Sequence, residues 1–82
     1  MMSGVITFYS SQQVMRAEKI LKKYNYEELL IPGPREISPN CGVAICFDYS
    51  KAEEIKELSK KEKILYENIY YYPEAKKISK WF

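Results

Sequence analysis

Two cysteines, Cys41 and Cys46, carry the most reactive side-chain atoms of this sequence, which contains no histidine. Without histidine the chain lacks the usual general base, the usual activator of a cysteine and the commonest metal ligand. A Cys-His catalytic pair within the chain is therefore excluded, and two cysteines alone do not make a structural zinc site, so we expect no metal. The chemistry that remains is that of a stabilised thiolate.

Cys41 lies where a proline-containing loop, residues 34–42, enters a predicted strand, and Gly42 follows it. A thiolate is stabilised by nearby cations and by the N-terminus of a helix. Arg35 is the nearest cation in the loop, and Gly42 leaves space for the backbone of a partner or for a sulfur adduct. In the alternative, purely structural interpretation, Cys41 is a small apolar side chain that packs at the end of the core nearest the loop. From these residues alone both interpretations remain open, with the structural one ahead.

Cys46 is the weaker candidate because it lies in the middle of a predicted strand. Five residues of extended strand span about 16 Å, so Cys46 cannot form a disulfide with Cys41 within one chain. We therefore expect Cys46 to be a residue of the sheet. Arg35 and Glu36 are either an anion-binding arginine with the neighbour that orients it or a solvated pair, and the second is the default because adjacent exposed charges gain little from pairing.

Four predicted strands and two predicted helices must position this loop. Short β-branched and aromatic runs predict strands over residues 5–9, 26–31, 43–49 and 66–72. Apolar residues at helical spacing predict one helix to about Tyr24 and another to about Lys61. Each helix is expected to begin with a capping box, in which a serine hydroxyl and a later side chain bond the first backbone N–H groups. The two capping boxes are Ser10 with Gln13 and Ser50 with Glu53.

The order strand-helix-strand-strand-helix-strand predicts an α+β fold, the ferredoxin-like two-layer sandwich. Its four-stranded antiparallel sheet carries both helices on one face, with the first and third strands in the centre. Ser10 and Ser11, at the start of the first helix, then share one end of the molecule with the Cys41 loop. We expect one domain over residues 1–72, followed by a C-terminal tail, residues 73–82.

Composition limits the partners and the location. The 82 residues carry a net charge of +2, from 13 basic and 11 acidic side chains, which is too balanced to indicate a nucleic-acid or membrane partner. No apolar run approaches the roughly 20 residues that span a bilayer, and the first residues lack the features of a signal peptide, so a cytoplasmic location is expected. An RNA recognition motif is disfavoured, because Ala44 and Cys46 on the open face of the third strand cannot stack on bases.

The run Pro32-Gly33-Pro34-Arg35-Glu36-Ile37-Ser38, followed by Cys41-Gly42-Val43-Ala44, resembles the selenium/sulfur carrier-like family. Three further segments resemble it as well: Thr7-Phe8, Ala17-Glu18-Lys19-Ile20-Leu21-Lys22 and Tyr66-Glu67-Asn68-Ile69-Tyr70. The resemblance covers the chain up to about Tyr72. Members of this family occur as small stand-alone proteins and as a domain fused to sulfur-carrier-type domains in selenium-metabolism proteins.

The resemblance implies that Cys41 holds sulfur or selenium as a persulfide or selenosulfide and passes it to a partner, and it favours a functional Cys41. It implies a donor such as a cysteine desulfurase, an acceptor protein, and no cofactor beyond the covalently held atom. The residues that it matches around the cysteine are Arg35, Glu36, Ser38 and Gly42. Whether the atom is sulfur or selenium, and whether the chain forms a homodimer, stay open.

Two other functions remain as alternatives. The chain could be a non-catalytic interaction or regulatory domain, in which an exposed sheet face with Cys46 and some of the tyrosines binds a partner and Cys41 is structural. Thiol redox enzymology is the weaker alternative, because there is no Cys-x-x-Cys pair and no resolving cysteine in reach. We therefore do not expect a stand-alone enzyme, and transfer of sulfur or selenium through a cysteine thiolate is the enzymatic activity that stays open. Selective alkylation of the folded protein separates the carrier from the interaction domain, since a carrier needs an accessible Cys41.

Overall fold

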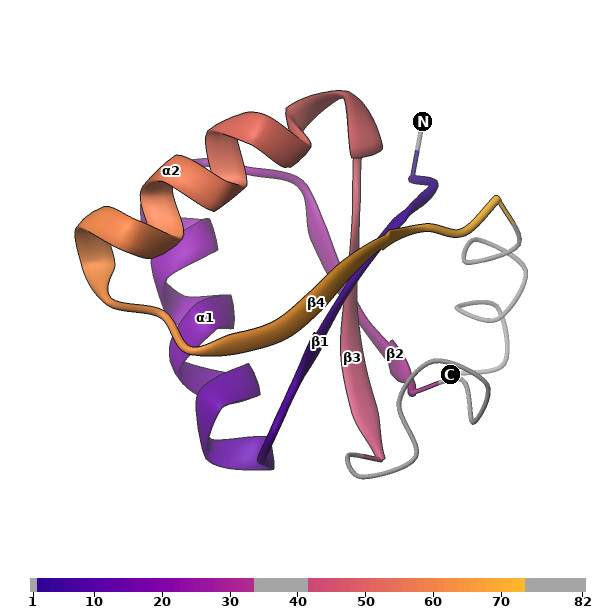
Figure 1. The fold of residues 1–82 in the computed structure, drawn as a ribbon, viewed down its shortest axis with the longest axis horizontal. Coiled ribbons are helices and arrows are strands. Elements are labelled where there is room, and N and C mark those ends of the chain that lie inside the picture. The colour runs from indigo at the N-terminus through magenta and orange to yellow at the C-terminus, as the bar shows by residue number, and fades with distance from the viewer. Residues whose placement is uncertain (1, 34–41, 74–82) are drawn as a thin grey trace.

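The computed structural model describes residues 2–33 and 42–73 of the chain. In this part, two α-helices lie on one side of a four-stranded sheet, so the fold has two layers (Figure 1). In chain order the elements are β1 (Gly4–Phe8), α1 (Ser11–Lys23), β2 (Glu28–Pro32), β3 (Val43–Phe47), the 3₁₀ turn η1 (Tyr49–Lys51), α2 (Ala52–Glu62) and β4 (Tyr66–Tyr71).

The sheet has the strand order β2-β3-β1-β4, and every neighbouring pair is antiparallel. The first and third strands are therefore central, as the sequence predicts. Val5 pairs with Cys46, and Cys46 pairs with Leu29, so these three residues form one row across the sheet. This arrangement confirms the predicted α+β sandwich with both helices on one face.

The main core lies between the sheet and the helices. Alternate residues of the central strands face the helices because side chains of a strand point to opposite sides in turn. Each large apolar side chain buried there contributes about 1.5–3 kcal/mol. The buried members of this core are Ile6, Phe8, Val14, Ala17, Leu21, Ile45, Phe47, Ala52, Ile55, Leu58 and Ile64.

A second, smaller cluster lies on the opposite side of the sheet, which we call the helix-free face. Its members are Val5, Ile31, Ala44 and Cys46, and all four are fully buried. Met2 and Tyr72 pack against them. The interaction-domain alternative, which placed Cys46 on an exposed sheet face, is therefore wrong for this residue.

The start of α1 differs from the predicted capping box. Ser10 is the N-cap residue and has an extended backbone, as expected, but its hydroxyl makes no capping hydrogen bond. The amide oxygen of Gln13, which should share this box, is buried without a hydrogen-bond partner. Ser10 is exposed, so its hydroxyl can bond water instead of the helix start.

The second predicted capping box is also wrong, because Asp48 takes the role that was assigned to Ser50. Asp48 Oδ1 accepts hydrogen bonds from the Ser50 backbone N–H at 3.0 Å and from the Ser50 hydroxyl at 2.9 Å. An ionised carboxylate is a stronger acceptor than a hydroxyl. It closes the 3₁₀ turn Tyr49–Lys51, and α2 begins after that turn, at Ala52 instead of Ser50.

Candidate functional site

The loop that contains Cys41 connects β2 to β3, and both of its described ends lie at the same end of these strands, which we call the loop edge of the sheet. Pro32, the last residue of β2, pairs with Val43, the first residue of β3. Immediately beyond this pair, the Gly33 N–H donates a hydrogen bond to the Gly42 carbonyl oxygen at 3.0 Å. β1 runs antiparallel to β3 and so ends at the same edge, where α1 begins (Figure 1). The loop ends and the helix start thus lie at the same end of the sheet because of the strand order.

Four residues of the predicted site lie outside the described residues: Arg35, Glu36, Ser38 and Cys41. Three others are described, namely Ser10, Ser11 and Gly42, and all three are exposed. What the structure supplies is therefore the frame of the site, formed by the Gly33–Gly42 hydrogen bond and the beginning of α1.

The first turn of α1 brings the positive end of the helix dipole to this edge. It contains no acidic side chain, and Ser10 provides no side-chain cap. The free backbone N–H groups of a helix start attract a negative charge that lies close to them. The edge is thus electrostatically suited to an anion such as a thiolate or a persulfide.

Gln13 is a residue of this helix start that sequence reasoning assigned to another role. Its buried Oε1 has no hydrogen-bond partner in the described structure. An unpaired buried amide oxygen costs about 1–3 kcal/mol, and it leaves an acceptor available for a donor at this edge. The only signal in the sequence was its position in the capping box, which predicted a different partner.

Gly42 occupies open space. A Cβ atom built on it would meet nothing within 4 Å, and its φ is not in the left-handed region. In the described structure, neither packing nor a special backbone conformation therefore requires a glycine at this position.

Cys46 is separated from this edge by most of β3. Its side chain is fully buried on the helix-free face, and its Sγ donates a hydrogen bond to the Met2 carbonyl oxygen at 3.3 Å. Burial raises the pKa of this thiol, because the thiolate would lose its hydration. The structure therefore confirms Cys46 as a residue of the sheet.

A match to a known family model shows the family of this chain. The family model described as "Putative Se/S carrier protein-like" matches residues 3–71, which includes every described strand and helix and the loop with Cys41. The chain belongs to this family.

A relative of this member of the Se/S carrier-like family is the "Putative sulfur carrier protein" of Aquifex aeolicus (strain VF5). The two are 45% identical over 67 residues, which is 79% of this chain and 34% of the relative. The chain thus spans about a third of the length of the curated relative that it matches. No solved structure matches the chain.

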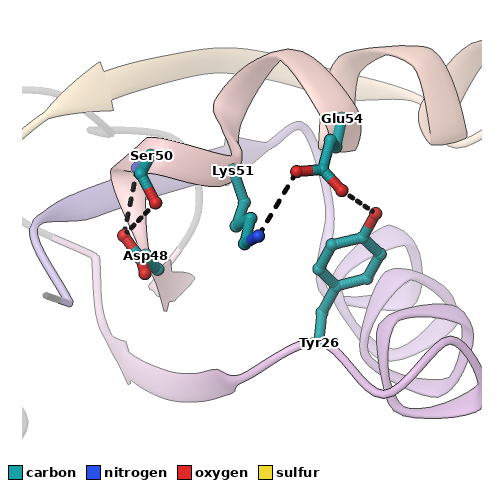
Figure 2. A network of polar contacts seen from close by, with 5 residues as sticks. All are labelled: Tyr26, Asp48, Ser50, Lys51 and Glu54. Atoms are coloured by element: carbon teal, nitrogen blue, oxygen red, sulfur yellow. Dashed lines mark hydrogen bonds and ion pairs between the residues drawn. The ribbon is translucent and has the colours of Figure 1, made fainter.

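The Se/S carrier-like chain also has a surface pocket of about 220 Å³ at the opposite edge of the sheet. Its lining comprises Asn25, Tyr26, Glu27, Asp48, Lys51 and Ile55. The Tyr26 hydroxyl donates to Glu54 Oε1 at 3.1 Å, and Lys51 Nζ lies 3.5 Å from Glu54 Oε2 (Figure 2). These contacts join the segment before β2 to α2.

Residues 2–33 and 42–73 contain no group of three or more histidine, cysteine, aspartate or glutamate side chains that could hold a metal ion. In the same residues, neither helix has the length and apolar character needed to cross a membrane.

Proposed function

We propose that this chain is a sulfur or selenium carrier, which holds the atom on Cys41 as a persulfide or selenosulfide and transfers it to a partner protein. The observation that carries the proposal is the family match over residues 3–71, which includes the Cys41 loop. The name of the curated relative, a sulfur carrier protein, supports the same role. The described frame fits it, because both described ends of the loop lie at the same end of the sheet as the start of α1.

Loading and delivery are two thiol exchanges of the same kind. In loading, the Cys41 thiolate attacks the outer sulfur of a donor persulfide; a new S–S bond forms on Cys41, the donor S–S bond breaks, and the donor leaves as a thiolate. In delivery, a thiolate of the acceptor attacks the outer sulfur on Cys41, and the Cys41 thiolate leaves. Neither step changes the total oxidation state, so neither needs an oxidant or a reductant. A cysteine desulfurase that carries a persulfide would be a suitable donor.

Charge stabilisation is the contribution of the residues around the cysteine. The positive end of α1 at Ser10 and Ser11 and the guanidinium of Arg35 would favour the Cys41 thiolate over the thiol. A lower thiol pKa also makes Cys41 a better leaving group during delivery. Glu36 and Ser38 would hold the loop, and Gly42 would leave the approach to the sulfur unobstructed, consistent with the open space around its Cα.

Intact-mass spectrometry tests the proposal directly. The wild-type chain, incubated with a cysteine desulfurase and cysteine and kept free of reductant, should gain the mass of one sulfur atom. Cys41→Ser should abolish the gain, and Cys46→Ser should keep it, because burial raises the pKa of the Cys46 thiol and shields it. Arg35→Ala should slow the loading of Cys41 without changing the far-ultraviolet circular dichroism.

The matched cysteine variants make the result decisive. A mass gain that persists in Cys41→Ser would place the sulfur elsewhere, and no gain in the wild type would remove the carrier function from this chain. In the second case, an interaction or regulatory role would be the better explanation of the family domain.

A further inference from the structure

A surface groove of about 460 Å³ lies between α1 and β2. Its described lining comes from both elements, and consists of Glu18, Lys22, Glu28, Leu29 and Leu30. β2 is an edge strand, which pairs with β3 on one side and with no described strand on the other. The groove therefore brings two carboxylates close to the free side of an edge strand.

The carboxylate of Glu28 is the most deeply buried charged group of this groove. Its side chain is 5% exposed, against 25% for Glu18 and 64% for Lys22. Glu28 Oε2 has no hydrogen-bond partner in the described structure. Lys22 Nζ lies 3.8 Å from Glu28 Oε1 and 3.8 Å from Glu18 Oε2, and both distances are longer than a hydrogen bond. The two carboxylates thus share one lysine that bonds neither closely, and an acceptor is left over.

The free side of β2 offers backbone groups beside this carboxylate. The Gly33 N–H donates to the Gly42 carbonyl oxygen, so these two residues form a hydrogen-bonded pair of the ladder. Such pairs alternate along an antiparallel ladder, so Glu28 and Leu30 direct their N–H and C=O groups away from β3. Pro32 has the same orientation but no N–H. The outward N–H donors of β2 are therefore those of Glu28 and Leu30, both of which line the groove.

We propose that this groove docks a partner protein through an extended segment, which pairs with the free side of β2 and places an arginine side chain against Glu28 and Glu18. In this mode of recognition the main-chain hydrogen bonds supply affinity, and a pocket for one side chain supplies specificity. The two carboxylates select a cation. A guanidinium fits them best, because its planar fork donates to two acceptors and is more weakly hydrated than an ammonium group.

Lys22 has to give way to the incoming arginine. Its side chain is 64% exposed and its contacts with both carboxylates are long, so little is lost when it turns toward solvent. The arginine then gives the Glu28 carboxylate the donors that it lacks. The buried and incompletely bonded carboxylate is thus explained as a group that completes its hydrogen bonds on binding.

The docked segment leaves the loop edge open. Glu28 and Pro32 are the two ends of β2, about 13 Å apart. The missing N–H of Pro32 ends the new ladder before the Cys41 loop begins. The proposal concerns a docking surface and does not depend on the transfer of sulfur or selenium at Cys41.

NMR titration of the nitrogen-15-labelled full chain provides the first measurement. The probe is a blocked five-residue peptide with a central arginine between valines, and its matched control contains citrulline, which has the same shape without the charge. The arginine peptide should shift the amide signals of Glu28 and Leu30 and approach saturation. The citrulline peptide should bind about tenfold more weakly or worse, because a hydrogen bond to a buried carboxylate is strong when the donor is charged.

Hydrogen exchange provides the second measurement, since it detects strand pairing and not charge. The Leu30 N–H points away from β3 and should exchange several-fold more slowly when the arginine peptide is bound. The Leu29 N–H is the internal control, because it already faces β3, and its exchange should change less.

A pair of variants separates docking from folding. Glu28→Gln should weaken binding of the arginine peptide about tenfold or more without lowering the urea midpoint. Glu27→Gln is the matched control, because it removes the same charge from an exposed neighbour that does not line the groove, and it should bind as the wild type does.

Three results overturn the proposal: no shift of the Glu28 and Leu30 signals at millimolar arginine peptide, equal binding of the arginine and citrulline peptides, or unchanged exchange of the Leu30 N–H in the bound state. A fourth is the appearance of the same shifts when the chain alone is concentrated, which would assign the free side of β2 to a second copy. The two peptides are compared on the wild-type chain, so this test stands even if Glu28→Gln fails to fold.

Discussion

Among single residues, Glu28 combines a carboxylate with a buried position and incomplete hydrogen bonding. Its side chain is only 5% exposed, and its Oε2 atom has no hydrogen-bond partner in the described structure. Lys22 Nζ lies 3.8 Å from Oε1. Burial and the nearby Glu18 carboxylate raise the pKa of Glu28, and Lys22 offsets only part of this. The ionised form of Glu28 is therefore destabilising.

The raised pKa of Glu28 predicts the sign of a pH effect. The folded chain holds this proton more tightly than the unfolded chain, so the contribution of Glu28 to stability is greatest below about pH 4.3, where the unfolded carboxyl titrates. It falls as the pH rises through the folded pKa. Glu28→Gln should therefore increase the free energy of unfolding at pH 7 by a few tenths to about 1 kcal/mol, and it should flatten the decline above pH 4.

Urea unfolding of wild type and Glu28→Gln between pH 4 and pH 7 measures this effect. Glu27→Gln is the control, because Glu27 is the exposed neighbour of Glu28. Equal pH slopes for Glu28→Gln and wild type would contradict the assignment of a destabilising carboxylate.

Among the secondary-structure elements, the two helix starts differ in whether a side chain accepts a hydrogen bond from a backbone N–H group. Ser10 ends an extended segment, but its hydroxyl does not cap α1. Asp48 caps the 3₁₀ turn before α2, and hydrogen bonds from the Ser50 N–H and hydroxyl lower the pKa of its carboxyl. This cap therefore stabilises the fold above the ordinary aspartate pKa and is lost as the pH falls through the lowered value.

Three single substitutions test this assignment of the caps. Asp48→Ala should lower the urea midpoint clearly, because the carboxylate accepts both hydrogen bonds from Ser50. Ser50→Ala should have a smaller effect, since its backbone N–H still donates to Asp48. Ser10→Ala should change the free energy of unfolding by less than about 0.5 kcal/mol. A larger loss for Ser10→Ala than for Asp48→Ala would reverse the assignment.

In the molecule as a whole, the core is tightly packed and the end of the sheet that holds the candidate loop is not. The surroundings of two glycines, Gly4 and Gly42, show this difference. A Cβ atom on Gly4 would lie 2.6–2.9 Å from three ring carbons of Phe47. A Cβ atom on Gly42, beside the candidate loop, would meet nothing within 4 Å. The first glycine permits the close packing of β1 against the Phe47 ring, whereas packing in the described structure does not require the second.

These two glycines give a matched pair of variants. Gly4→Ala should destabilise the chain by about 1–3 kcal/mol because the Phe47 ring has to move in a packed core. Gly42→Ala should leave the free energy of unfolding within about 0.5 kcal/mol of wild type. Thermal unfolding of both variants checks this, and a large loss for Gly42→Ala would show that this edge is more tightly packed than the described structure indicates.

The strands, the helices and their order could be predicted from patterns in the sequence, and the loop with Cys41 was singled out there as the candidate site. Alternation in Val43, Ile45 and Phe47 and the helical spacing of Val14, Ala17 and Leu21 are local patterns, and the few allowed connections between such elements then select the sheet order. The caps, the buried Glu28 and Gln13 oxygens and the complete burial of Cys46 were decided only by the tertiary structure. They depend on competition between hydrogen-bond acceptors and on segments that meet across the sheet, and neither is encoded in the spacing of residues along the chain.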